Sequence, residues 1–173
     1  ENKKIGDKVI ITDNEYAISD INDLYTASGF KIKLEKTSAA TVFQGAAGDL
    51  IDVLKLVESY TGPVRATDTL GSSAENINTL VGLITGVVTG TINSTVEVDS
   101  DLVASLTNVK TTDKISFAST NVAADATDIV ALKAKLPLAN FSKITEIEGT
   151  PDDIAALKSA ANIVKSADVK VEP

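Results

Sequence analysis

The feature that most constrains the fold is a short apolar motif that recurs along the chain at nearly constant intervals. The motif is an acid or amide, then Ile, Leu or Val, then Leu about one helical turn later. Its clearest copies are TDIVALKAKLP (127–137) and DDIAALKSAAN (152–162), which share an Asp-Ile-x-Ala-Leu-Lys core. The apolar anchor positions of all copies are 21, 51, 77, 103, 129 and 154, so the successive intervals are 30, 26, 26, 26 and 25 residues. This regularity predicts a repeat of about 26 residues over nearly the whole chain.

Each copy has a second part, a short segment of alternating β-branched and polar residues that favours a strand. These segments are KVIIT (8–12), FKIKLE (30–35), PVRAT (63–67), STVEVD (94–99), KISFA (114–118), KITEIE (143–148) and VKVE (169–172). Around 90–98 two candidates compete for the strand, GTIN and TVEV. Consecutive strands joined by a helix within so few residues should be parallel, with right-handed crossovers.

One repeat is therefore a strand, a turn, a short helix and a return loop. Because a unit of this size cannot bury its own apolar face, stacking of neighbouring units is required. We expect an α/β fold, a right-handed β/α solenoid of about six 26-residue repeats in one array over residues 1–173, with a parallel sheet on one face. An irregular insertion at 37–48, with an extra turn or short helix, accounts for the interval of 30 residues. The competing fold is a doubly wound α/β domain with helices on both sides of the sheet.

The expected helix starts carry capping residues. In GTPDD (149–153), Thr150 is the expected N-cap, Pro151 suits the first turn, and Asp152 and Asp153 complement the helix dipole. Ser72 or Ser73 should begin another helix, and the residues at 99–101 and 37–40 should act similarly.

Composition excludes several classes of function. The net charge of -8 leaves no basic stripe for nucleic acid, and it disfavours an anionic membrane surface. The chain has no Cys, Met, His or Trp, which removes thiolate nucleophiles, imidazole bases and the usual zinc ligands. The apolar run 77–92 is shorter than the roughly 20 residues of a spanning helix and predicts a buried helix followed by a loop or strand, so we expect no membrane insertion. Because the first residue is Glu1, we expect a processed chain or a fragment.

No residue set identifies a reaction, so we expect a protein that is not an enzyme. The glycine pairs in GAAGDL (45–50) and TGVVTG (85–90) match no phosphate-binding motif and predict turns. Asp152 and Asp153 could be imagined as an acid and a base, but charge at a helix N-terminus explains them better. No cofactor is expected apart from candidate calcium.

Calcium prefers oxygen ligands, and two acidic clusters lie in expected turns. Asp13, Asn14 and Glu15 come from TDNE, and Asp99 and Asp101 come from EVDSD. Helix capping explains these acids equally well, and no EF-hand loop is present.

Lysines and tyrosines offer weaker candidates. Lys133, Lys135 and Lys158 predict a solvated helix face with favourable dipole placement. Tyr16, Tyr25 and Tyr60 could stack on a sugar, although rings buried at helix edges are the more ordinary expectation.

The segments STNVAADATDIVALKAKL (119–136) and KITEIEGTPDDIAALKSA (143–160) resemble the repeat regions of bacterial surface-layer (S-layer) proteins and of repeats-in-toxin-like secreted adhesins. The resemblance covers mostly residues 115–172. It implies an extracellular or cell-surface location, and in that family calcium binding and lattice assembly are usual. The glycine-rich calcium repeats of the family are missing here, so no family site residue is carried over.

These observations predict a non-enzymatic structural segment of a secreted or cell-surface bacterial protein, an S-layer protein or an adhesin. Its partners would be further copies of itself or neighbouring domains of the same surface protein. The alternative is a binding module for a surface glycan, lipopolysaccharide or a partner protein. For that alternative the irregular second repeat (30–62) is the candidate site, and deletion of Ala39 to Gly45 should abolish binding and spare folding.

Overall fold

The computed structural model of the chain describes residues 9–11, 18–29, 32–34, 42–57, 60–159 and 168–171. These residues form six helices: α1 (Ile18–Ser28), α2 (Ala47–Leu56), α3 (Ala74–Leu83), α4 (Ser100–Ser105), α5 (Ala126–Lys135) and α6 (Pro151–Ser159). They also form nine strands: β1 (Val9–Ile11), β2 (Ile32–Leu34), β3 (Phe43–Gly45), β4 (Val64–Ala66), β5 (Val88–Ile92), β6 (Lys114–Phe117), β7 (Ala123–Asp125), β8 (Glu146–Gly149) and β9 (Asp168–Val171). The fold is therefore α/β, as the sequence predicts.

Every described strand pair is parallel, which confirms the expected strand direction. The strands form three open sheets in the orders β1-β2, β3-β4-β5-β6 and β7-β8-β9. Each strand thus pairs with the next one in its sheet, and the intervening segment carries the crossover. An isolated parallel bridge between Ala118 and Asn140 joins the residues that follow β6 to those that precede β8.

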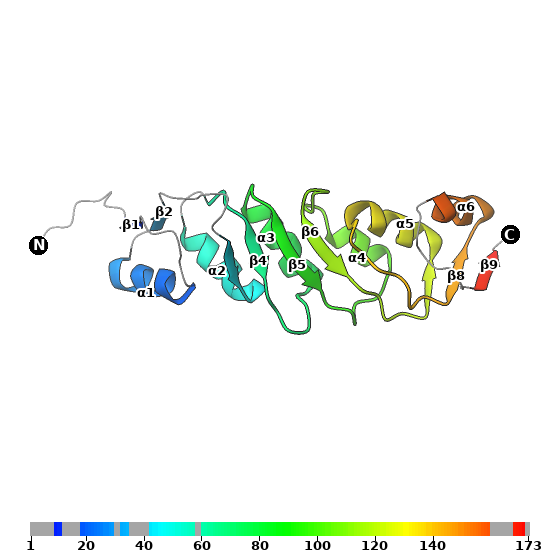
Figure 1. Ribbon diagram of the computed structural model, residues 1–173, viewed down its shortest axis with the longest axis horizontal. Coiled ribbons are helices and arrows are strands. Elements are labelled where there is room, and N and C mark those ends of the chain that lie inside the picture. The colour runs from blue at the N-terminus through cyan, green and yellow to red at the C-terminus, as the bar shows by residue number, and fades with distance from the viewer. Residues whose placement is uncertain are drawn as a thin grey trace, which may run out of the picture.

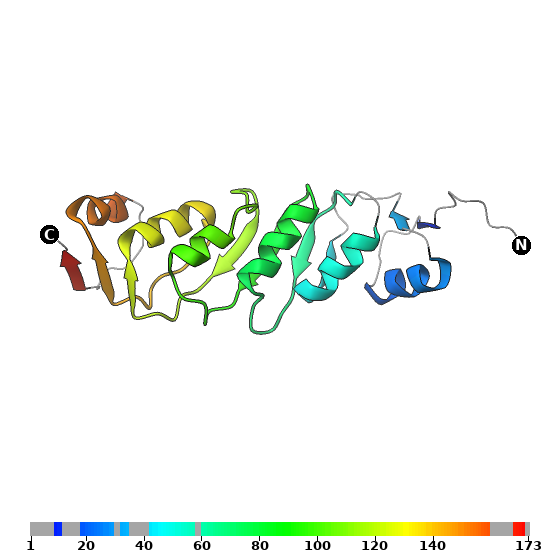
Figure 2. The same ribbon diagram turned by 180° about the vertical axis from the view of Figure 1, so that it is seen from behind.

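The molecule is elongated, and the two ends of the chain lie at opposite ends of its long axis (Figure 1). Strands β4, β5 and β6 lie in front of the helices in that view, and the view from behind shows α2, α3, α4 and α5 in front (Figure 2). Each helix from α1 to α5 contacts the helix that follows it. Strands and helices therefore form two layers that are built up stepwise along the chain.

The core lies between these layers and is built from the predicted anchors. Each of the six helices carries one anchor position, and Ile21, Ile77 and Ile129 are fully buried. Val103 is the exception, because it is only half-buried and its neighbour Leu102 points into the core. Leu102 in the six-residue helix α4 and Leu106, its C-cap residue one turn later, are both buried, so the anchor there is one residue earlier than predicted.

Five of the predicted strands are found near their predicted positions, and β8 begins slightly later than predicted. The predicted strand at 94–99 is wrong, because β5 lies earlier, at Val88–Ile92. Val88, Gly90 and Ile92 face the core, and a Cβ on Gly90 would lie only 3.0 Å from Ile77 Cδ1. Gly90 thus gives a buried strand position close to α3, where we predicted a turn. The expectation of a helix followed by a loop or strand over 77–92 is confirmed by α3 and β5.

Two short strands are absent from the sequence prediction. The insertion at 37–48 contains β3, which pairs with β4, and its first residues lie outside the described part of the chain. The Phe43 ring is buried and packs on the Tyr60 ring with 5.5 Å between ring centroids. Gly45 and Gly48 lie in β3 and α2 and form no turn of their own. The second unpredicted strand, β7, has the sequence AAD.

Helix capping follows the prediction at three starts, and at α4 the predicted residue Asp99 accepts a hydrogen bond from Leu102 N at 2.8 Å. Ser73 accepts a hydrogen bond from Asn76 N at 3.1 Å at the start of α3. Thr150 Oγ1 accepts one from Asp153 N at 3.4 Å, and the Asp153 carboxylate accepts one from Thr150 N at 3.2 Å. This reciprocal pair is a capping box at the start of α6.

Candidate functional site

The predicted metal ligands do not come together as a site in the described residues. Asp13, Asn14 and Glu15 lie outside those residues. Asp99 is the N-cap of α4 and accepts a hydrogen bond from Leu102 N at 2.8 Å. Asp101 follows in the first turn and is exposed. Both of the described acids therefore have a role at the helix start.

A second group of acids lies where α4 and α5 begin. Burial raises the pKa of Asp128 above its ordinary value, and the charges of Asp125 and Asp99 raise this pKa further. Within the described part of the chain, no three acidic side chains are arranged to hold a metal ion. Calcium binding by the acidic turns therefore stays a prediction.

The carboxylate pair at the start of α6 is explained by capping. Asp153 accepts hydrogen bonds from both the backbone N–H and the hydroxyl of Thr150. Asp152 is exposed beside it in the first helical turn. These contacts place the Asp153 carboxylate on the helix terminus, where it stabilises the unpaired N–H groups.

The predicted dipole placement is confirmed for Lys133 and Lys135, which lie in the last turn of α5, whereas the predicted full solvation is not found. Both side chains are half-buried and donate to backbone carbonyls. Lys133 Nζ donates to the oxygens of Pro137 and Ala139, at 2.8 and 3.0 Å. The side chain of Lys158 is outside the described set.

Lys135 reaches from α5 to the end of the preceding helix. Its Nζ lies 2.9 Å from both Val103 O and Leu106 O, which belong to the C-terminal end of α4. Lys110 does the same one step earlier, since its Nζ donates to Ile84 O at the end of α3 at 3.3 Å. Cations at these carbonyls are favourable because the helix C-terminus is negative.

The two described tyrosines, Tyr25 and Tyr60, do not form the stacking surface that a sugar site would need. Tyr60 is buried, and its hydroxyl donates to Pro63 O at 3.1 Å. Tyr25 is half-buried against the core, and Tyr16 lies outside the described residues.

Three polar side chains that the sequence did not single out connect successive strand–helix units. Asp68 accepts from Ala47 N at 3.0 Å and so caps α2, whose own N-cap Ala46 makes no side-chain cap bond. Asn121 accepts from Val98 N at 3.3 Å, just before α4. The buried Asp113 accepts from Val88 N at the start of β5, at 2.9 Å. No local motif marks these residues, because each partner lies 21 to 25 positions earlier in the chain.

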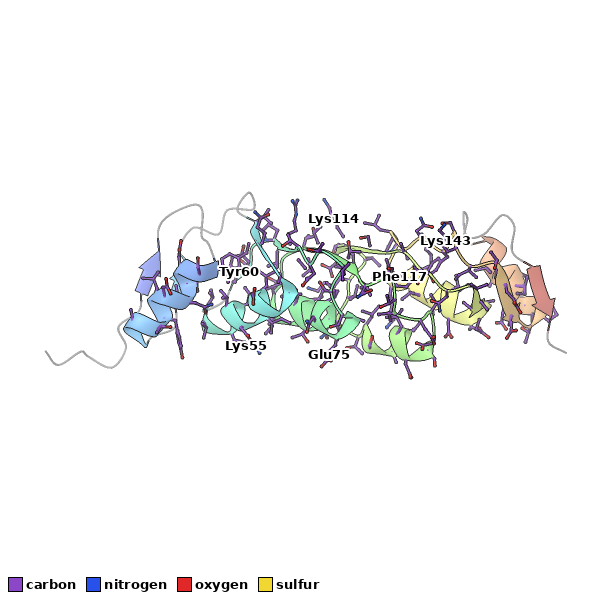
Figure 3. The ribbon with its side chains drawn as sticks, turned by 90° about the horizontal axis from the view of Figure 1, so that it is seen from below. Lys55, Tyr60, Glu75, Lys114, Phe117 and Lys143 are labelled. Carbon is purple, nitrogen blue, oxygen red and sulfur yellow. The ribbon has the colours of Figure 1, made fainter. Side chains whose placement is uncertain are left out.

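The exposed face of the four-stranded sheet is the most distinctive described surface. Its outward or partly outward positions are Gln44, Arg65, Thr89, Thr91, Lys114 and Ser116. We call these residues the sheet face. Arg65 pairs with Thr89, and Thr89 with Lys114, so the two cations lie in one row across β4, β5 and β6. Figure 3 shows Lys114 on the side of the strands, and Lys55 and Glu75 on the opposite side along the helices.

The irregular second repeat was the other candidate surface. Deletion of Ala39 to Gly45 would remove β3 from the four-stranded sheet, together with the buried Phe43. The described part of this segment therefore has a structural role, and the expectation that its deletion spares folding is not supported by the structure.

Comparison with protein-family models gives no match for this chain. Comparisons with curated proteins and with solved structures give no match either.

Proposed function

We propose that the chain is a non-enzymatic structural segment of a secreted or cell-surface bacterial protein, an S-layer protein or an adhesin. In this proposal it is a right-handed β/α solenoid of about six repeats of about 26 residues. It works at the cell surface by holding a fixed spacing and presenting a face for contact with further copies or with neighbouring domains.

The observation that carries the proposal is the way in which successive units interlock. Anchors 26 residues apart lie in successive helices, as for Ile51 in α2 and Ile77 in α3. The bond that Lys135 donates to Val103 O and the bond that Asp113 accepts from Val88 N join units that follow one another in the chain. Interactions confined to neighbouring units are typical of repeat arrays, which serve as extended scaffolds.

The side-chain chemistry supports a structural role over catalysis. Three of the described side chains that the sequence offered for chemistry, Asp99, Asp153 and Lys135, are hydrogen-bonded at helix ends. In the described residues, no helix has the length and apolar character needed to cross a membrane. The negative net charge disfavours nucleic acid as a partner.

The sheet face favours a second candidate function. Its hydroxyls, amide and two cations suit an acidic surface glycan, lipopolysaccharide or a partner protein. A binding module would use this face, since the insertion at 37–48 includes β3 of the same sheet.

Negative-stain electron microscopy of the concentrated protein, with calcium and with chelator, tests the proposal. We expect ordered sheets or filaments. Their loss on chelation would assign calcium a role and make Asp99 and Asp101 worth mutating, whereas their persistence would leave a structural role without calcium. Dispersed particles in both conditions would contradict assembly by this segment and favour the binding module.

A further inference from the structure

We infer that the sheet face of one copy packs on the acidic helix face of a second copy, so that copies stack in an open-ended layer. This inference rests on the proposed structural function and names the surfaces that would carry it. The evidence is the opposite charge of the two layers in residues 43–117.

The sheet face carries positive charge on a chain whose net charge is -8. Arg65 and Lys114 are exposed, and no acidic residue occupies an outward position among the described residues of β3, β4, β5 and β6. Between the two cations lies Thr89, and the hydroxyls of Thr91 and Ser116 are 2.7 Å apart on the same face. All six residues of the sheet face are polar. We therefore expect the two cations to determine which partner surface it binds.

The helix layer carries the complementary charge. Asp49, Glu75 and Asp101 are all exposed in the first turns of α2, α3 and α4. They are spaced 26 residues apart, and each of these three successive helices presents one exposed acid in its first turn. Asp52 adds a further exposed acid on α2, where Lys55 pairs with it at 3.5 Å. We call Asp49, Glu75 and Asp101 the acidic row.

The spacings of the two rows match. Arg65 and Lys114 are two strand steps apart, which is about 9.6 Å at roughly 4.8 Å between neighbouring strands. Packed helices lie about 8–10 Å apart, so neighbouring members of the acidic row are separated by about the same distance. Each cation of one copy can therefore meet an acid on a separate helix of the next copy.

The contact uses two different surfaces of the same molecule and is therefore heterologous, which leads to open-ended assembly. Four strands of three to five residues give a footprint of roughly 250 Å², well below the roughly 800 Å² per partner of a stable interface. A single contact is thus weak and sensitive to salt, and it becomes effective when many copies are linked or concentrated.

Charge reversal tests the inference. The sheet variant combines Arg65→Glu with Lys114→Glu, and the helix variant combines Asp49→Lys with Glu75→Lys. At high protein concentration and about 0.15 M salt, sedimentation velocity of the wild type should show self-association that decreases at higher salt. Each variant alone should lose it, at least tenfold in association constant, and an equimolar mixture of the two should regain it.

The matched control is Lys143→Glu, which reverses an exposed lysine outside the four-stranded sheet and should leave self-association unchanged. Circular dichroism checks that every variant is folded. If ordered assemblies persist in the sheet variant, the inference is wrong although the proposed function stands. Loss in both variants without recovery on mixing also overturns it. A wild type that stays monomeric yet binds heparin through Arg65 and Lys114 would show that the sheet face binds a polyanion. This result would overturn both the stacking of copies inferred here and the self-assembly in the proposed function.

Discussion

Asp113 is a buried carboxylate whose two oxygens accept from two backbone groups in different strand–helix units. Oδ1 accepts from Val88 N and Oδ2 from Lys110 N, each at 2.9 Å. We expect Asp113→Ala to lower the free energy of unfolding by roughly 2–4 kcal/mol, because it leaves both N–H groups without this acceptor. Urea unfolding measures the change. Glu97→Ala, an exposed acid in the preceding loop, is the control and should change stability by less than about 0.5 kcal/mol.

Asp128 should make stability depend on pH. Its folded pKa is raised above the ordinary value of 3.8 by burial and then by Asp125 and Asp99. The stability contributed by its protonated form is therefore full below pH 3.8 and is lost as pH rises through the folded pKa. We expect Asp128→Asn to raise the melting temperature at pH 7 and to have little effect at pH 3.

Thermal unfolding at both pH values provides the measurement. The exposed Asp152 occupies the first turn of α6, so Asp152→Asn should give no such gain at pH 7. An equal gain for Asp128→Asn at both pH values would show that charge is not the cause.

Residue-scale features divide clearly into those that the sequence could reveal and those that it could not. The anchors and Thr150 were predictable, because apolar period and capping are local patterns. The bonds of Lys135 and Asp68 were not, because their partners are 21 to 32 residues away and a lysine on a helix has the same local pattern whether solvated or engaged. In α4 the local pattern predicts Val103 as the anchor, whereas Leu102 is the buried residue, and the pattern cannot separate them because both are apolar.

At the scale of elements, the shortest helix, α4, depends on a neighbour. Six residues give a helix little stability of their own, and Lys135 Nζ lies 2.9 Å from two carbonyls at its C-terminal end. We expect Lys135→Met to destabilise the protein by roughly 1–2 kcal/mol. The amides of α4 should exchange with solvent faster than in the wild type.

Hydrogen exchange with mass spectrometry locates the effect. Lys143→Met, at an exposed lysine, is the matched control and should leave α4 protected. Faster exchange spread evenly over α2, α3 and α4 would argue against a specific bond at this helix end.

Strand positions show why element prediction was incomplete. Residues 94–99 and 88–92 both alternate, and the choice depends on which segment can lie against α3. Gly90 allows that close approach, yet in the sequence a glycine indicates a turn more often than a buried strand. β7 was missed because Ala and Asp have low strand propensity, and it is fixed by pairing with β8.

At the scale of the whole molecule, the arrangement of two layers separates stability from surface chemistry. The core lies between strands and helices from Ile21 to Leu157, and neighbouring units supply its contacts. The outer surfaces of the layers are then free to differ in charge, as Arg65 and Lys114 on the strands differ from Glu75 on the helices. An elongated two-layer array can thus carry two distinct contact faces without any change in its core.

The same architecture predicts which helices lose hydrogen-exchange protection when one buried side chain is truncated. Leu80 in α3 is fully buried, and Leu80→Ala should cost about 2–5 kcal/mol. If units interact mainly with their neighbours, the loss of hydrogen-exchange protection should be largest in α2, α3 and α4 and smallest in α6.

Leu132→Ala, at the equivalent buried position of α5, should give the opposite gradient, with the largest loss in α4, α5 and α6. Hydrogen exchange on both variants shows whether the loss of protection is local to the substituted helix and its neighbours or uniform over all helices. A uniform loss across every helix in each variant would mean that the chain unfolds as one cooperative unit, and it would contradict the proposed repeat array.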